Sequence, residues 1–278
     1  MPPDVVFMIP HGADSIWLKK TYKSFRKHIT PELETYMNIE MDKGATEIAE
    51  IASHLIANAG LKCTTFLINY NRGILDGGRI PGHEKRTHAP SSFAEEFKEE
   101  LTKLHLNTTN FISQLFRSLP SHTTFIDLHT MAPTSPSGFD KNKSEHYVSS
   151  LTEYNSTYLT NNNGPTRPIN ILSHDENGKL ITDAGLNASI TEAFSTHEFR
   201  ISNNEPFSAN SKYMMNRYLK LLAGTAIDFP KHLVAKGNLS TFKLDEFEIC
   251  PKKVEKISRC LATGILNFKK SKLCMKEN

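Results

Sequence analysis

Two histidines stand at the ends of apolar runs that have the composition of buried strands. His11 follows the run VVFMIP, and His129 lies in the run TTFIDLHT together with Asp127. Successive side chains of a strand point to opposite faces, so Asp127 and His129 are expected on the same side of the backbone. Imidazole nitrogens are common ligands of Zn²⁺. The two histidines therefore predict a metal site at the ends of these strands.

Two aspartates are candidates for the third ligand. A zinc hydrolase needs three protein ligands and a remaining position for water, and two imidazoles with one carboxylate are a common set. Asp14 follows His11 by three residues, whereas Asp42 leads the segment DKGATEIAEIA. Asp14 could instead be a solvated loop acid, and Asp42 could be the N-cap of a helix. The residues alone leave both candidates open.

A third apolar run, TTFLINY, is followed by Asn71 and Arg72. In open α/β sheets, ligands bind in the crevice beyond the carboxyl ends of the strands. Three predicted strands thus end in residues that can do chemistry, which favours one shared site at this edge of a sheet.

The segments that must position these residues alternate between strand-like and helical patterns. Strands are predicted at 4–10, 62–70, 122–130, 168–175, 198–202 and 239–249, and helices at 44–60, 91–119 (with an interruption), 183–197 and 252–268, with 211–224 helical or mixed. Such alternation with long connections predicts a three-layer α/β/α fold around a central mixed, mainly parallel sheet. No repeat or linker divides residues 1–278, which we expect to form a single catalytic domain whose segment 261–278 ends in a basic tail.

Composition and charge exclude several classes of protein. The formal net charge is +3, and the basic residues are spread along the chain apart from the terminal run NFKKSKLCMK. A nucleic-acid-binding surface is usually denser in positive charge, and no apolar stretch approaches the roughly 18 residues of a membrane span. A Sec signal peptide is not indicated, and the four cysteines form no CxxC pair. We expect a cytoplasmic protein without nucleic-acid or membrane partners; its oligomeric state is not indicated.

Several short motifs, taken in order, resemble the N-formylglutamate amidohydrolase family. They are IPHGA at 9–13, MDKGATEIAEIASHL at 41–55, INYNR at 68–72, IDLHTM at 126–131, NNEPFSAN at 203–210 and EFEI at 246–249. The order of the set, over about residues 5–268, is what makes it specific. HGAD, YNR and DLH are also similar to aspartoacylase and succinylglutamate desuccinylase, and more remotely to zinc carboxypeptidases. The resemblance implies a zinc-exopeptidase-like (phosphorylase/hydrolase-like) fold that cleaves an amide bond with zinc-activated water.

The resemblance also implies a ligand set. His11 and His129 fall on the family's metal-binding histidines. The deacylases and carboxypeptidases have a glutamate three residues after the first histidine, which corresponds to Asp14. The formylglutamate family instead has an aspartate before the following helix, which corresponds to Asp42. The surrounding match of DKGATEIA favours Asp42.

Substrate-binding roles follow from the same resemblance. Asn71 and Arg72 are implied to bind the substrate. Arg72 is implied to bind its carboxylate, because the planar guanidinium pairs with a carboxylate through two hydrogen bonds. Asn204 and Phe207 belong to the segment that resembles the family's Asn-x-Pro-Phe motif, and they are expected to contact the substrate.

The general base is expected in the segment FKLDEFEIC. Among Asp245, Glu246 and Glu248, the leading candidate is Glu248, because FEI resembles the family's apolar–Glu–apolar triplet; Glu246 follows. The family usually has glutamine at the position of Glu246, so this segment departs from the pattern.

The function implied is hydrolysis of an amide bond in a small, carboxylate-bearing acyl-amino acid or peptide, with Zn²⁺ or another divalent metal as cofactor. An aspartoacylase-like deacylase or a carboxypeptidase-like peptidase is the alternative among enzymes. From another class, the alternative is an inactive family member that acts as a binding protein.

Overall fold

The central element of the computed structural model is a six-stranded sheet with the order β2-β1-β3-β6-β4-β5. The structure describes residues 2–13, 29–81, 92–134, 151–160, 164–239 and 242–274. The strands are β1 (Val5–Ile9), β2 (Cys63–Leu67), β3 (Thr124–Met131), β4 (Ile169–Leu172), β5 (Ile201–Asn203) and β6 (Gly224–Pro230). All neighbouring strands are parallel except β4 and β6, which are antiparallel. The predicted mixed, mainly parallel sheet is confirmed.

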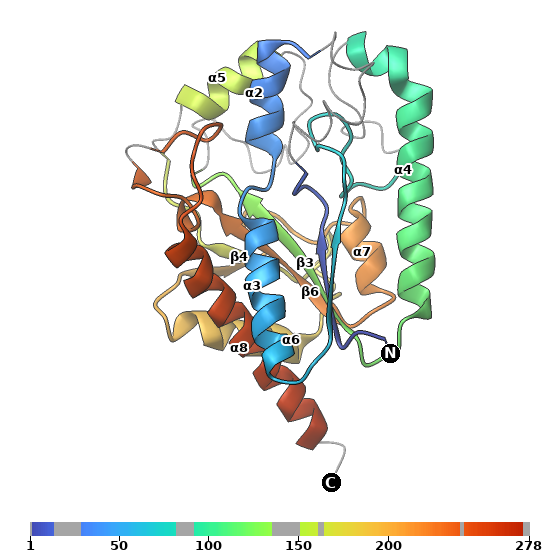
Figure 1. Ribbon diagram of the computed structural model, residues 1–278, viewed down its shortest axis with the longest axis vertical. Coiled ribbons are helices and arrows are strands. Elements are labelled where there is room, and N and C mark those ends of the chain that lie inside the picture. Colours follow the sequence, from blue (N-terminus) through green and yellow to red (C-terminus); the bar gives the residue numbers. More distant parts are fainter. Residues whose placement is uncertain are drawn as a thin grey trace.

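Helices cover both faces of this sheet, which gives the predicted three layers (Figure 1). They are α2 (Pro31–Glu40), α3 (Ala45–Asn58), α4 (Ser92–Ser118), α5 (Leu151–Thr160), α6 (Ala184–Ser195), α7 (Met214–Leu219) and α8 (Pro251–Cys274). The alternation of β1 assigns the faces: Val5, Phe7 and Ile9 belong to the core with α3, α6 and α8. Val6 and Met8 belong to the opposite core with α4 and α7.

Two helices lie beyond the carboxyl ends of β1 and β3, where the candidate site is. Helices α2 and α5 pack against each other there, at the upper end of the molecule in Figure 1. The start of α2 is defined by Thr30, whose hydroxyl accepts a hydrogen bond from the backbone N–H of Leu33, and by Pro31 at the first helical position. Neither α2 nor α5 is predicted from the sequence patterns.

The structure corrects the prediction in the second half of the chain. Residues 211–224 contain only the short helix α7, and the unpredicted β6 begins at Gly224 in the middle of the sheet. The predicted strand at 239–249 is wrong, because its described residues form turns and one isolated bridge between Ala235 and Ile249. Helix α4 is continuous, and α8 runs on to Cys274, so most of the expected basic tail is helical.

None of the helices in the described ranges is long and apolar enough to cross a membrane.

Candidate metal centre and active site

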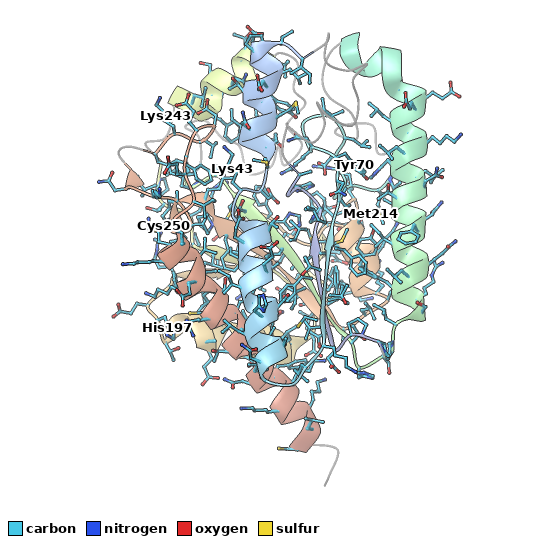
Figure 2. All side chains as sticks on the ribbon, in the orientation of Figure 1. Lys43, Tyr70, His197, Met214, Lys243 and Cys250 are labelled. Atoms are coloured by element: carbon cyan, nitrogen blue, oxygen red, sulfur yellow. The ribbon has the colours of Figure 1, made fainter. Side chains whose placement is uncertain are left out.

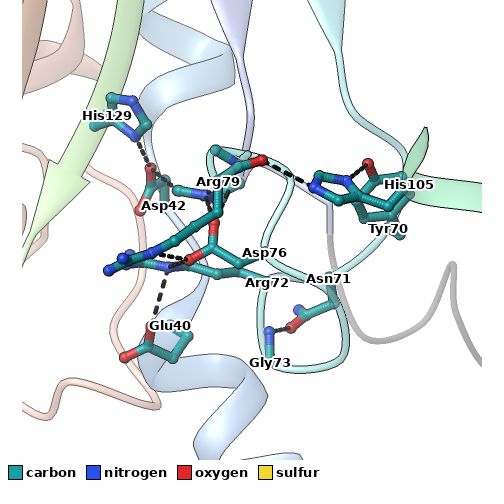
Figure 3. Close-up of polar contacts among 12 residues, drawn as sticks. Glu40, Asp42, Tyr70, Asn71, Arg72, Gly73, Asp76, Arg79, His105 and His129 are labelled. Atoms are coloured by element: carbon teal, nitrogen blue, oxygen red, sulfur yellow. Dashed lines mark hydrogen bonds and ion pairs between the residues drawn. The ribbon is translucent and has the colours of Figure 1, made fainter. Parts of the chain in front are cut away.

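Two of the predicted histidines and one of the two predicted aspartates meet at the ends of β1 and β3. His11, Asp42 and His129 are all buried, and each offers a ligand atom within 4.8 Å of the others. Oδ2 of Asp42 lies 3.3 Å from Nδ1 of His11 and 2.9 Å from Nδ1 of His129. The contact between Asp42 and His129 is drawn in Figure 3. Asp14, the other candidate for the third ligand, lies outside the described residues.

The second ring nitrogen of each histidine is held by another buried carboxylate. Nε2 of His11 is 2.8 Å from Oδ1 of Asp76, and Nε2 of His129 is 2.9 Å from Oδ2 of Asp127. A histidine that binds a metal usually donates its other ring N–H to a carboxylate or carbonyl, which fixes the ring and its tautomer. Both rings therefore direct Nδ1 toward Asp42.

The backbone brings Asp42 to the histidines by a short route. The backbone N–H of Asp42 donates to the carbonyl of His11 at 2.9 Å, which ties the connection between α2 and α3 to the end of β1. The N-cap of α3 is Gly44, with φ of 93° and no side-chain capping bond. Asp42 is thus not the N-cap that its position before a helix also suggested, and its carboxylate faces the histidines.

At Asp42 and His129, charged partners together affect the pKa more than burial does. Burial opposes ionisation of Asp42, but the close contacts and charge of His11 and His129 hold the pKa of this carboxyl well below its usual range. Burial would also lower the pKa of His129, but Asp127 and Asp42 raise it well above its usual value. The carboxylates that attract a proton to His129 would attract another cation to the same place.

The donor set fits a divalent metal ion. Nδ1 of His11 is buried and makes no hydrogen bond to any described residue, although it points at the carboxylate of Asp42. Two imidazole nitrogens and one carboxylate oxygen are a set that holds Zn²⁺ and, with other preferences, further divalent ions. His11, Asp42 and His129 are therefore the residues that would hold the metal.

The cluster opens into a cavity of about 110 Å³, which has room for several water molecules or a small ligand. Besides the acids Glu40, Asp42, Asp76 and Asp228, its lining contains basic, aromatic and apolar groups, among them Arg72, Arg79, Arg167, Lys231, Tyr154, Tyr158, Phe207, Tyr213, Met131 and Met215. The basic groups are held by fixed partners. Nε of Arg72 lies 3.1 Å from Glu40 and 3.4 Å from Asp76. The guanidinium of Arg167 lies over the ring of Phe207, 5.6 Å from its centroid. An anionic ligand would meet preorganised guanidinium groups here.

An acid that the sequence analysis did not select also lines the cavity. Asp228 lies on β6, and its register partner on the neighbouring strand β3 is His129. Its Oδ1 is buried without a hydrogen-bond partner among the described residues. Burial, the largest effect, raises the pKa of Asp228 to about 7. The sequence signal was present, because Ile227 and Phe229 flank this acid in an apolar–acid–apolar triplet.

The structure places Glu246 and Glu248 outside this cavity. The side chain of Glu248 is 73% exposed and pairs with Lys236, and that of Glu246 is 63% exposed and pairs with Lys243 at 2.9 Å. Figure 2 shows Lys243 at the outer edge of the molecule. Because the expected strand is absent here, neither glutamate is aimed at the histidines. Asp245 contributes its backbone carbonyl to Lys43.

The predicted substrate-binding residues separate into two groups. Arg72 and Phe207 line the cavity. Asn71 is fully buried and holds its loop: its side-chain amide donates to the carbonyls of Ala13 and Met37 and accepts from the N–H of Gly73. Asn204 accepts hydrogen bonds from the backbone of Ser173 and His174. Asn71 and Asn204 thus shape loops, and neither is among the residues that line the cavity.

No protein-family profile and no curated protein sequence matches the chain. Solved structures match it over nearly its full length. A gene product from Agrobacterium tumefaciens has a TM-score of 0.56 and 12% identity, over 99% of this chain and 92% of that chain. The N-formylglutamate amidohydrolase from Ralstonia eutropha has a TM-score of 0.54 and 11% identity, over 97% and 94%. At this identity the likeness shows a shared fold, which is the predicted α/β fold with a mixed, mainly parallel sheet.

Proposed function

We propose that this protein is a metal-dependent amidohydrolase that cleaves an amide bond in a small, carboxylate-bearing acyl-amino acid. The observation that carries the proposal is the buried set of His11, Asp42 and His129, in which a carboxylate backs each histidine and a cavity opens beside it. The fold supports it, because the Ralstonia eutropha structure of the same fold is an N-formylglutamate amidohydrolase.

The cation, when bound, would polarise the scissile carbonyl and lower the pKa of a water molecule. The residues of the chain supply the remaining tasks. Oδ1 of Asp228 would accept the proton of the attacking water and pass it to the leaving nitrogen, since it is buried, unpaired among the described residues and in the cavity lining. The C–N bond then breaks to give a carboxylic acid and an amine.

The guanidinium groups would hold the substrate in place. Arg72 lines the cavity with its Nε turned to Glu40 and Asp76, so its orientation is fixed before a ligand arrives. A carboxylate bound by a preorganised arginine would place the amide beside the histidines. No nucleic acid or membrane is part of this proposal. We place the reaction in the cytoplasm, in keeping with four cysteines that form no disulfide in the structure.

The test is a substrate panel with metal analysis. The purified protein, stripped with a chelator and reloaded with Zn²⁺, would be assayed on N-formyl-L-glutamate, N-acetyl-L-aspartate and a dipeptide with a free C-terminus. We expect hydrolysis of an acyl-amino acid that the chelator abolishes and Zn²⁺ restores. Cleavage of the aspartate derivative alone would favour the deacylase, and of the dipeptide alone the peptidase. Zinc binding without turnover of any of the three substrates would instead support a binding protein that has the fold of an enzyme.

A further inference from the structure

We propose that Asp76 is a positioning residue that couples the cation-binding histidine to the carboxylate-binding arginines. The inference rests on the proposed function, since that function supplies both the cation and the substrate carboxylate. Asp76 lies in the loop after β2, is 2% exposed, and uses each of its two oxygens for a different half of the site.

Oδ1 of Asp76 belongs to the metal half. It lies 2.8 Å from Nε2 of His11 and accepts a hydrogen bond from the backbone N–H of Gly78 at 3.0 Å. The loop approaches the ring so closely here that a Cβ atom on Gly78 would lie 2.8 Å from Nε2 of His11. The loop therefore fixes the carboxylate and the imidazole relative to each other.

Oδ2 of Asp76 belongs to the substrate half. It lies 3.4 Å from Nε of Arg72 and 3.5 Å from Nε of Arg79. Arg79 is further restrained by the ring of Tyr213, whose centroid lies 4.8 Å from its guanidinium carbon. Figure 3 shows both guanidinium groups extending past Asp76 in the same direction, and both residues line the cavity. One carboxylate thus aligns two arginines.

Asp127, the carboxylate behind the other histidine, does only the first of these two tasks, the support of a histidine. Asp127 holds Nε2 of His129 as Asp76 holds Nε2 of His11. The second oxygen of Asp127 is buried and makes no hydrogen bond within the part of the chain that the structure describes. Asp127 is therefore a matched control, in which the same chemical change removes support from a histidine without touching the arginines.

The shared carboxylate predicts that the cation and the substrate carboxylate strengthen each other's binding. An anion bound to Arg72 and Arg79 offsets their positive charge, so Asp76 becomes a stronger acceptor for the ring N–H of His11. A stronger acceptor at Nε2 makes Nδ1 a more basic ligand. Binding of a carboxylate should therefore tighten cation binding, and by reciprocity the cation should tighten carboxylate binding by the same factor.

The experiment measures Zn²⁺ affinity by competition with a chromogenic chelator, with and without saturating glutarate as the carboxylate probe. The wild type, Asp76→Asn and Asp127→Asn are compared. We expect both variants to lose about 10- to 100-fold in Zn²⁺ affinity. Glutarate should tighten Zn²⁺ binding in the wild type and in Asp127→Asn but not in Asp76→Asn. Calorimetry on the metal-free proteins should show weaker glutarate binding in Asp76→Asn alone.

The outcomes separate this inference from the proposed function. Failure of the wild type to bind Zn²⁺ would overturn both. Tight Zn²⁺ binding with the same glutarate effect in both variants would overturn only the role of Asp76. If Asp76→Asn does not fold, Arg79→Gln takes its place: it removes one of the charges that weaken Asp76 as an acceptor, so it should bind Zn²⁺ at least as tightly as the wild type without glutarate and show a smaller glutarate effect. An undiminished effect in that variant would overturn the coupling.

Discussion

At the scale of single residues, Asp228 is the carboxylate whose environment suits proton transfer. It is buried beside the cluster, and burial raises its pKa to about 7. Asp228→Asn should therefore lower kcat by about 10²- to 10⁴-fold, because an amide cannot accept the proton. Zinc content should stay at the wild-type level, since the ligands are untouched. Steady-state kinetics and elemental analysis of the same preparation measure both quantities.

Glu248→Gln is the control for that prediction. Its side chain is exposed and pairs only with Lys236 among the contacts described for it, so kcat should remain within about twofold of the wild type. A large loss of kcat in Glu248→Gln with a normal kcat in Asp228→Asn would instead place the general base in the segment 242–250.

Single substitutions also test which aspartate is the third metal ligand. Asp42→Ala should release zinc, because Oδ2 of Asp42 is the oxygen that faces both Nδ1 atoms. Asp14→Ala should retain it, and His129→Ala is the positive control for loss. Elemental analysis after gel filtration gives the metal content. Zinc lost from Asp14→Ala and kept in Asp42→Ala would instead support the deacylase-type ligand set.

The sequence indicated which residues would lie close together where the local pattern is clear. His11 follows β1 and His129 lies within β3, as the apolar runs indicated, and the match around Asp42 placed this aspartate beside them. The resemblance of FEI to the family's triplet led to Glu248, and Asp228, which also lies between apolar residues in the sequence, was not considered. Only the tertiary structure shows that the triplet of Asp228 lies in a central strand, whereas that of Glu248 lies in irregular backbone with the glutamate exposed.

At the scale of elements, the start of α3 fixes Asp42 relative to β1. Gly44 has φ of 93°, and a Cβ atom there would lie 2.8 Å from Cγ2 of Val234. Gly44→Ala should cost about 1–2 kcal/mol for the left-handed backbone. The crowding against Val234 should cost about 1–3 kcal/mol more. Urea unfolding would measure the change, and zinc affinity should fall with it because the turn carries Asp42.

Substitution of Gly60 measures the cost of the left-handed backbone without the crowding. It follows α3 with φ of 91°, and a Cβ atom there would meet nothing within 4 Å. Gly60→Ala should lose only the stability that the left-handed backbone costs, about 1–2 kcal/mol. Its zinc affinity should be unchanged. Equal losses in the two variants would mean that the contact with Val234 does not constrain the turn.

Elements were predictable where one periodicity dominates. In α3, Ala45, Ile48, Ala49, Ala52 and Ile56 are buried at spacings of three and four, as the sequence pattern indicated. The segment 239–249 was mistaken for a strand because Phe242 and Leu244 alternate as in a strand, yet they enter the core from irregular backbone and a turn. Strand β6 was missed because it begins directly after the helical pattern of 211–224.

At the scale of the whole molecule, the cluster joins parts of the chain that are far apart in sequence. His11 follows β1, Asp42 lies between α2 and α3, and His129 belongs to β3. A cation held by all three binds the folded chain and not the unfolded one, so it should stabilise the fold as a whole. At a free concentration of about 100 times Kd, the gain is about 2.7 kcal/mol.

For a chain of this size that gain corresponds to a rise in Tm of about 5–10 °C. Thermal unfolding of the chelator-treated protein, scanned with and without Zn²⁺, would measure it. Asp42→Ala should show no rise at the same zinc concentration, because a cation with two neutral ligands and no carboxylate binds too weakly to be populated. The same rise in Asp42→Ala would show that the stabilising ion sits elsewhere, and the assignment of His11, Asp42 and His129 as its ligands would have to be given up.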